Sequence, residues 1–150
     1  MDPEAERLAL AVEDALPMWV VRSVERVLTA WQGRPDPAVL ERAADAGRRA
    51  AEEVGGDVRL LLAADVDAQG TTPLTLLRAA VRYPTSVLRE AGVPPVERDR
   101  FDECHFPEDP YGLTPMSFAD VDPSLHEPGL WWGAKKASIH LRRRREEGPR

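Results

Sequence analysis

Apolar residues recur every three or four positions along most of the chain, which is the spacing of amphipathic helices. A first helix is predicted for residues 3–15, where Leu8 and Val12 share a face. A second is predicted from Pro17 to Gly33, and Pro17 either separates the two or kinks one longer helix. The buried stripe of the second helix is expected to consist of Trp19, Val20, Val24, Val27, Leu28 and Trp31.

The helix predicted for residues 37–54 has an unusually small apolar stripe. Small side chains let the backbone of a neighbouring helix approach closely, so we expect a tightly packed helix pair here. Gly55 and Gly56 follow and are expected to end the helix. The stripe consists of Val39, Ala43, Ala46, Ala50 and Val54, with Ala44, Gly47 and Ala51 beside it.

Two further elements are predicted before residue 92. The run from Asp57 to Asp67 is short and apolar, a pattern that fits either a buried strand or a helix. We favour a helix because Leu and Ala dominate the run and no partner strand is visible in the chain. The next helix is predicted from Pro73 to Ala91, with Gly92 as its stop. Pro84 lies inside it and predicts a kink or a split after Tyr83.

Five Asp-Pro or Thr-Pro pairs mark expected helix starts. In each pair the Asp or Thr oxygen can accept from a free amide of the first turn. The proline occupies the first helical position, where no amide bond is lost. The pairs are Asp2–Pro3, Asp36–Pro37, Thr72–Pro73, Thr114–Pro115 and Asp122–Pro123. Their repetition supports an all-α fold.

The segment from Phe101 to Leu130 has neither a helical nor a strand period, yet it is rich in aromatic and apolar residues. Long irregular segments in compact domains are usually functional or disordered, and these side chains favour order. We therefore predict an ordered loop cap over residues 101–130. A terminal helix is predicted from Leu130 to Glu147, with residues 142–150 as a frayed basic tail. The whole chain, residues 1–150, is predicted to be a single all-α domain of about six or seven helices.

Composition narrows the functional classes. The net charge of −6 argues against general nucleic-acid binding, which needs a basic surface. A single cysteine allows no internal disulfide and is typical of a reducing compartment. The start of the chain is acidic and helical rather than a signal peptide, and no apolar run is long enough to span a membrane. We expect a cytoplasmic protein. The cations are 18 arginines and two lysines, a bias that indicates a GC-rich genome.

Candidate metal ligands gather in the predicted loop cap. His105 and His126 are imidazole donors, and Asp102 and Glu108 are nearby carboxylates, a set that suits zinc, iron or manganese. The spacing matches no established metal motif, however, and the histidines equally suit hydrogen bonds to backbone groups in a packed loop. A metal-dependent enzyme or small-molecule binder centred on these residues is therefore the alternative interpretation.

Other catalytic and binding patterns are weaker. Cys104 could act as a nucleophile beside His105, but its acidic neighbours would raise the pKa of the thiol. Asp109 belongs to Glu108–Asp109–Pro110, a sequence typical of a turn. Arg142–Arg145 is the only basic block, and it supports a second alternative, a DNA-associated regulator. No glycine-rich phosphate loop occurs, so no cofactor is expected.

Trp131 and Trp132 give the best indication of a partner surface. Adjacent residues on a helix point about 100° apart, so both tryptophans do not fit the centre of one narrow stripe. One is expected to anchor the core while the other lies at a boundary, where aromatic side chains often anchor protein contacts. Phe106 and Tyr111 of the loop cap are grouped with them as predicted contact residues.

The second half of the chain resembles a small family of proteins from GC-rich actinobacteria to which no activity is assigned. The resemblance rests on TTPLTLLRAAVRYPTSVLREAGVPPVERDRF and on FPEDPYGLTPMSFADVDPSLHEPGL, and it covers roughly Thr71 to Leu141. It implies that this half is the core of the module and that the N-terminal helices vary more. It implies no activity and assigns no residue a role.

Taken together, the residues favour a non-enzymatic, cytoplasmic protein-interaction or regulatory domain that binds a protein partner through the acidic and aromatic segment 101–132. The argument is partly negative, because no catalytic pattern reaches useful specificity. Membrane and nucleic-acid partners are not expected, and self-association is left open.

Overall fold

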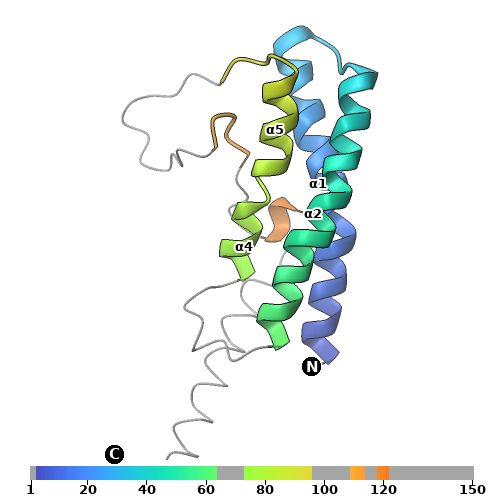
Figure 1. Cartoon of the computed structure of the whole chain (residues 1–150), viewed down its shortest axis with the longest axis vertical. Helices are drawn as coiled ribbons and strands as arrows, with labels where there is room; N and C mark the ends of the chain where they lie inside the picture. The colour runs from blue at the N-terminus through green and yellow to red at the C-terminus, as the bar shows by residue number, and fades with distance from the viewer. Residues whose placement is uncertain (1–2, 64–72, 96–108, 114–117, 122–150) are drawn as a thin grey trace, which may run out of the picture.

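The computed structural model describes residues 3–63, 73–95, 109–113 and 118–121 of the 150-residue chain. The predicted all-α class is confirmed, because the described residues contain helices and no strand. Figure 1 shows the helices side by side along the long axis of the molecule. The elements are α1 (Pro3–Gln32), α2 (Pro37–Ala63), α4 (Pro73–Ala79), α5 (Arg82–Glu90) and the 3₁₀-helix η1 (Phe118–Asp120).

The prediction of six or seven helices is wrong for the described part of the chain. It contains three helical segments, which are α1, α2 and a third that is split into α4 and α5. The difference arises because two predicted pairs of helices are each one continuous helix. Pro17 lies inside α1, and Gly55–Gly56 lie inside α2.

Pro17 does not end α1, because both halves of the helix bury apolar residues on the same core. Val12 and Leu16 before the proline, and Val20 and Val24 after it, are all fully buried. An interior proline removes one backbone hydrogen bond and costs about 3 kcal/mol. Burial of one side chain of this kind contributes about 1.5–3 kcal/mol, so the packing of several outweighs the proline.

The small stripe of α2 packs against α1 at very short range, as its composition predicted. A Cβ atom added to Gly47 would lie 2.8 Å from the carbonyl oxygen of Pro17. One added to Gly55 would lie 2.7 Å from Cγ of Glu13. Both glycines are buried inside α2. Their lack of a side chain lets α1 approach, and the helix continues through them. The predicted stop at Gly55–Gly56 is therefore wrong.

The run that follows Gly56 is helical, as we favoured from its Leu and Ala content. It forms the last part of α2, as far as Ala63, and buries Val58, Leu61 and Leu62. The remainder of the predicted element, residues 64–67, lies outside the described residues.

A short connection joins α1 to α2 and reverses the chain. Gly33 adopts a φ of +82° and donates its N–H to the carbonyl of Thr29 at 2.9 Å, which ends α1. Asp36 then accepts the N–H of Ala38 at 2.9 Å through Oδ1, and Pro37 is the first helical residue. This cap confirms one predicted Asp-Pro start. Pro3 and Pro73 also begin helices, whereas the pairs at 114–115 and 122–123 lie outside the described residues.

The third segment is split, as predicted, but the break lies at Ala80–Val81 rather than directly after Tyr83. α4 ends at Ala79, and the chain turns through Ala80 and Val81. The break precedes the proline because a proline fits the first turn of a helix, where its missing N–H has no partner to lose. Pro84 accordingly occupies the first turn of α5.

Gly92 stops α5 two residues after its last helical residue, Glu90, as predicted. Gly92 has a φ of +78° and donates to the carbonyl of Arg89 at 3.0 Å, while Val93 donates to Leu88 at 3.1 Å. This pair of bonds is the Schellman motif. Leu88 and Val93 are both buried in the core, so the helix end is also fixed by packing.

The core contains residues from all the described helices and from the two later pieces, 109–113 and 118–121. Figure 1 shows α1 and α2 crossing, so that α2 lies between α4 and α1 in the lower half of the view and α1 lies between α5 and α2 in the upper half. The stripe predicted for α1 ends at Leu28, because the side chain of Trp31 is 47% exposed at the end of the helix.

Candidate interaction site

The described part of the predicted loop cap begins with a tight turn at residues 109–113. Asp109 is buried and accepts the N–H of Leu113 at 2.8 Å through its carboxylate. Its carbonyl accepts the N–H of Gly112 at 3.3 Å, and Gly112 has a φ of +68°. The carboxylate thus organises the turn, in agreement with the turn pattern of Glu108–Asp109–Pro110.

Tyr111 attaches this turn to the end of α5. Its hydroxyl donates to the carbonyl of Val93 at 2.7 Å, in a buried position directly after the Schellman motif. Burial raises the pKa of Tyr111, and the positive charge of Arg89 opposes that shift. With only 5% of its surface exposed, Tyr111 is an internal packing residue. Its place among the predicted partner-contact residues stays a prediction, and its burial leaves little of the side chain to reach a partner.

The loop cap is anchored at more than one position. Leu113 and Val121 belong to the same hydrophobic core as the helices. The other predicted site residues lie outside the described part of the chain, so their positions and mutual distances stay untested. These are Asp102, His105, Phe106, Glu108, His126, Trp131, Trp132 and Arg142–Arg145.

A second polar cluster joins α5 to α2. The Tyr83 hydroxyl donates to Glu53, and Arg82 donates to that hydroxyl at 3.0 Å through Nη2. The Arg82 guanidinium also lies 4.9 Å from the centre of the Tyr83 ring. Burial is the main cause of a raised pKa for Tyr83, and the bond to Glu53 adds to it. The cluster links α5 to α2.

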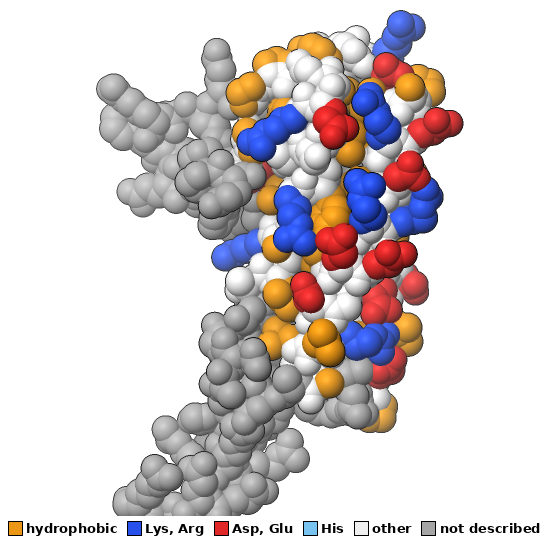
Figure 2. Space-filling view, in the orientation of Figure 1, with side chains coloured by type: hydrophobic (Ala, Val, Ile, Leu, Met, Phe, Trp, Pro, Cys, Tyr) orange, Lys and Arg blue, Asp and Glu red, His pale blue; other side chains and the backbone are white. Residues whose placement is uncertain are grey.

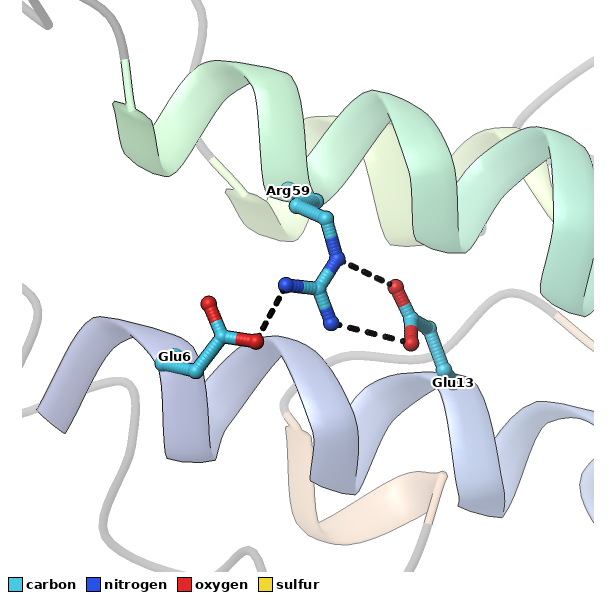
Figure 3. A network of polar contacts seen from close by, with 3 residues as sticks. All are labelled: Glu6, Glu13 and Arg59. Atoms are coloured by element: carbon cyan, nitrogen blue, oxygen red, sulfur yellow. Dashed lines mark hydrogen bonds and ion pairs between the residues drawn. The ribbon is translucent and has the colours of Figure 1, made fainter. Parts of the chain in front are cut away.

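A third cluster clamps the first half of α1 to the last half of α2. Figure 3 shows Arg59 of α2 pointing between Glu6 and Glu13 of α1. Its Nε and Nη2 atoms donate to the two carboxylate oxygens of Glu13 at 2.9 and 3.1 Å, and Nη1 donates to Glu6. These hydrogen bonds, with Glu13 first and Glu6 second, raise the pKa of Arg59. The two carboxylates are therefore committed to an arginine.

Within the described residues, no group of three or more His, Cys, Asp or Glu side chains is arranged to hold a metal ion. The predicted metal ligands lie elsewhere in the chain and are not tested by this finding. Figure 2 shows arginine and acidic side chains interspersed over the face it draws, without a continuous basic patch.

Four large apolar side chains of the described residues are exposed, and the sequence analysis missed all four as surface residues. They are Leu10, Met18, Trp31 and Leu60. Leu10 and Met18 lie on the side of α1 away from the stripe of Leu8 and Val12. Their positions outside the main apolar stripe of the predicted helix were the feature of the sequence that could have identified them as surface residues.

No family model matches the chain, and neither does any curated protein or solved structure. The resemblance to an actinobacterial family stays a prediction. Among the helices that the structure describes, none has the length and apolar character needed to cross a membrane.

Proposed function

We propose that this chain is a non-enzymatic, cytoplasmic protein-interaction domain that binds a protein partner through segment 101–132. One observation carries the proposal. Part of the segment is built into the core, since Tyr111 donates to Val93 and both Leu113 and Val121 are buried. A segment anchored in this way can present its remaining side chains from a fixed position on the helices.

The contact residues of the proposal are Phe106, Trp131 and Trp132. Phe106 precedes the anchored turn by three residues, a length of chain that spans at most about 10 Å. Trp131 and Trp132 follow Val121 by ten and eleven residues. Aromatic side chains on a positioned segment are frequent anchors of protein–protein contacts, because they bury a large area at little cost in side-chain entropy.

The polar clusters of the described helices also support a binding role over an enzymatic one. Arg59 pairs with Glu6 and Glu13, and Arg82 pairs with Glu53. Each cluster links two helices and leaves its carboxylates bonded to an arginine. Their chemistry is that of helix packing.

The test is quantitative partner capture with Trp132→Ala and a matched tryptophan control. The tagged wild-type chain is used to capture and identify a partner by mass spectrometry, and the affinity of the purified pair is then measured. Trp132→Ala should weaken binding at least tenfold, as expected for an anchor residue. Trp31→Ala removes a tryptophan that is exposed at the end of α1, and it should leave the affinity unchanged.

Thermal unfolding of both variants checks the fold. Equal affinities of wild type and Trp132→Ala, with both chains folded, would overturn the proposal. So would equal losses in the two variants, because binding would then not depend on segment 101–132. Unfolding of Trp132→Ala would show that Trp132 is a core residue, and the proposed contact surface would be wrong.

A further inference from the structure

α1 carries an apolar stripe on its outer side. Leu10 and Met18 are 47% and 50% exposed, and Pro17 and Val21 beside them are half-buried. Relative to Leu10, the other three follow at seven, eight and eleven positions, which places all four in a band about 100° wide. Isolated exposed apolar residues are common on soluble proteins. Leu10 and Met18 form an exposed strip two turns long, and its inner edge joins the core, because Pro17 lies against Gly47 of α2 and Val21 packs against core residues.

The described helices leave Leu10 and Met18 of this strip uncovered. α1 packs against α2 along most of its length, and α5 packs against both. Those contacts bury other residues of α1, such as Val12, Leu16 and Val20. Leu10 and Met18 remain exposed beside them, so the bundle offers room for one more helix against α1.

We propose that the helix predicted from Leu130 to Glu147 docks on this strip through residues 130–141 and completes a four-helix bundle. The apolar face of that helix is large at one end and small in its middle, so its backbone can approach α1 closely. Its members are Leu130, Trp131, Ala134, Ala137, Ser138 and Leu141. α2 packs against α1 by the same device, with Ala43, Ala46, Gly47 and Ala50.

The course of the chain brings this helix within reach of α1. The last described residue, Val121, is buried in the core directly after η1. Figure 1 draws η1 between α4 and α2, and α2 packs against α1. Eight residues lie between Val121 and Leu130, and the nine steps of the chain can span at most about 30 Å when extended. The strip from Leu10 to Met18 is only about 12 Å long on a helix, so the connection is long enough.

The charges of the two helices are complementary. Asp14 lies within the strip, and Glu25 continues the same side of α1 two turns further on. On the docking helix, Lys135 and Arg142 flank the apolar face at about 80–100° from its centre at Ala134. α1 already joins α2 by this chemistry, because Glu6 and Glu13 both bind an arginine of the neighbouring helix.

The docked helix assigns different roles to the two adjacent tryptophans. Trp131 belongs to the face that packs on α1. Trp132 lies about 160° round the helix from Ala134 and points away from α1. This part of the inference rests on the proposed function, because it makes Trp132 the side chain presented to the partner and Trp131 the anchor beneath it.

Disulfide formation in the full chain tests the docking. Cys104→Ser removes the only native cysteine. In that background Asp14→Cys is combined, one at a time, with Ala134→Cys, Ala137→Cys and Ser138→Cys. A disulfide requires Cα atoms about 4.4–6.8 Å apart. At least one pair should form an intramolecular disulfide about tenfold faster than its control, because docking raises the effective concentration of the thiols.

The control replaces Asp14→Cys with Arg26→Cys, an exposed position on the same helix about 160° round from Leu10. Equal rates in test and control chains would overturn the docking. Disulfide-linked dimers in place of the internal link would also overturn it, because a second copy would then cover the strip. Thermal unfolding checks that each variant is folded.

This experiment needs no partner, so it separates the inference from the proposed function. An internal disulfide without Trp132-dependent binding would leave the docked helix standing and remove the partner site. Trp132-dependent binding without any internal disulfide would do the reverse.

Discussion

At the scale of single residues, Gly47 and Gly56 lie in the same helix and have opposite roles. A Cβ atom on Gly47 would meet the backbone of Pro17 at 2.8 Å, whereas one on Gly56 would meet nothing within 4 Å. Gly47→Ala should lower the free energy of unfolding by about 1–3 kcal/mol, because the two backbones must separate. Gly56→Ala should raise it by about 0.5–1 kcal/mol, since alanine favours the helix.

Urea denaturation of the wild type and of each variant measures both effects. The slope of the free energy with urea concentration should stay unchanged, so that the midpoints report stability alone. Stabilisation by both substitutions would contradict the close approach of α1 and α2. Such a result would mean that helix propensity, and not the contact at Pro17, controls position 47.

Residues that act locally could be predicted from the sequence. Asp36 caps α2 and Gly92 ends α5, because a cap depends on side chain and backbone geometry within one turn. The hydrogen-bond partner of Tyr111 and the exposure of Trp31 could not be predicted in the same way. The Tyr111 hydroxyl binds a carbonyl 18 residues earlier in the chain. Exposure of Trp31 depends on where the neighbouring helices end.

At the scale of elements, the hydroxyl of Tyr111 holds the 109–113 turn on the end of α5. Tyr111→Phe removes the donor and leaves the buried Val93 carbonyl without it. The free energy of unfolding should fall by about 1–3 kcal/mol. Tyr83→Phe is the matched control, and it should cost less, because the partner of that hydroxyl, Glu53, is largely exposed to water.

Native-state hydrogen exchange locates the effect within the molecule. The amides of Gly112 and Leu113 bond inside the turn, so Tyr111→Phe should speed their exchange more than that of α2. A uniform change across the chain would show that the turn does not open as a separate unit. No change at all would contradict the docking of the turn on α5.

The type of each described helix could be predicted, but its ends could not always be. Pro17 and Gly55–Gly56 read locally as breaks, yet α1 and α2 continue through them. The energetic cost of Pro17 is offset by the apolar residues buried on both sides of it. Gly55 leaves the room that Glu13 of α1 needs to approach. Both reasons are tertiary. The split before Pro84 is local, and a stricter use of first-turn geometry would have placed it correctly.

At the scale of the whole molecule, periodicity alone was enough for the all-α class, because an amphipathic helix must bury its stripe against another element. The small stripe of α2 also predicted which face would pack closely. The placement of the 109–113 turn on α5 depends on long-range contacts that no local pattern encodes. The anchors of the candidate site could not be predicted for the same reason, because they are defined by the residues they pack against. These anchors are Tyr111, Leu113 and Val121.

The charge composition gives the whole molecule a specific response to alkaline pH. Of the 20 cations 18 are arginines, which keep their charge well above pH 10, so ion pairs such as Arg59 with Glu13 persist. The chain's only tyrosines, Tyr83 and Tyr111, both have a pKa raised above the ordinary value of 10.0, mainly by burial. Tyrosine ionisation should therefore dominate alkaline unfolding.

The direction of this pH effect follows from the linkage between proton binding and the free energy of unfolding. Below pH 10 both phenols are protonated in the folded and unfolded states, so they give no pH dependence. Above pH 10 the unfolded chain loses these protons first and binds fewer than the folded chain, so the free energy of unfolding falls as pH rises. Urea denaturation across this range should show the decline in a Cys104→Ser, Lys135→Arg, Lys136→Arg background, which removes the other groups that titrate nearby. Adding Tyr83→Phe and Tyr111→Phe should flatten it, and an unchanged slope would mean that another group drives the alkaline transition.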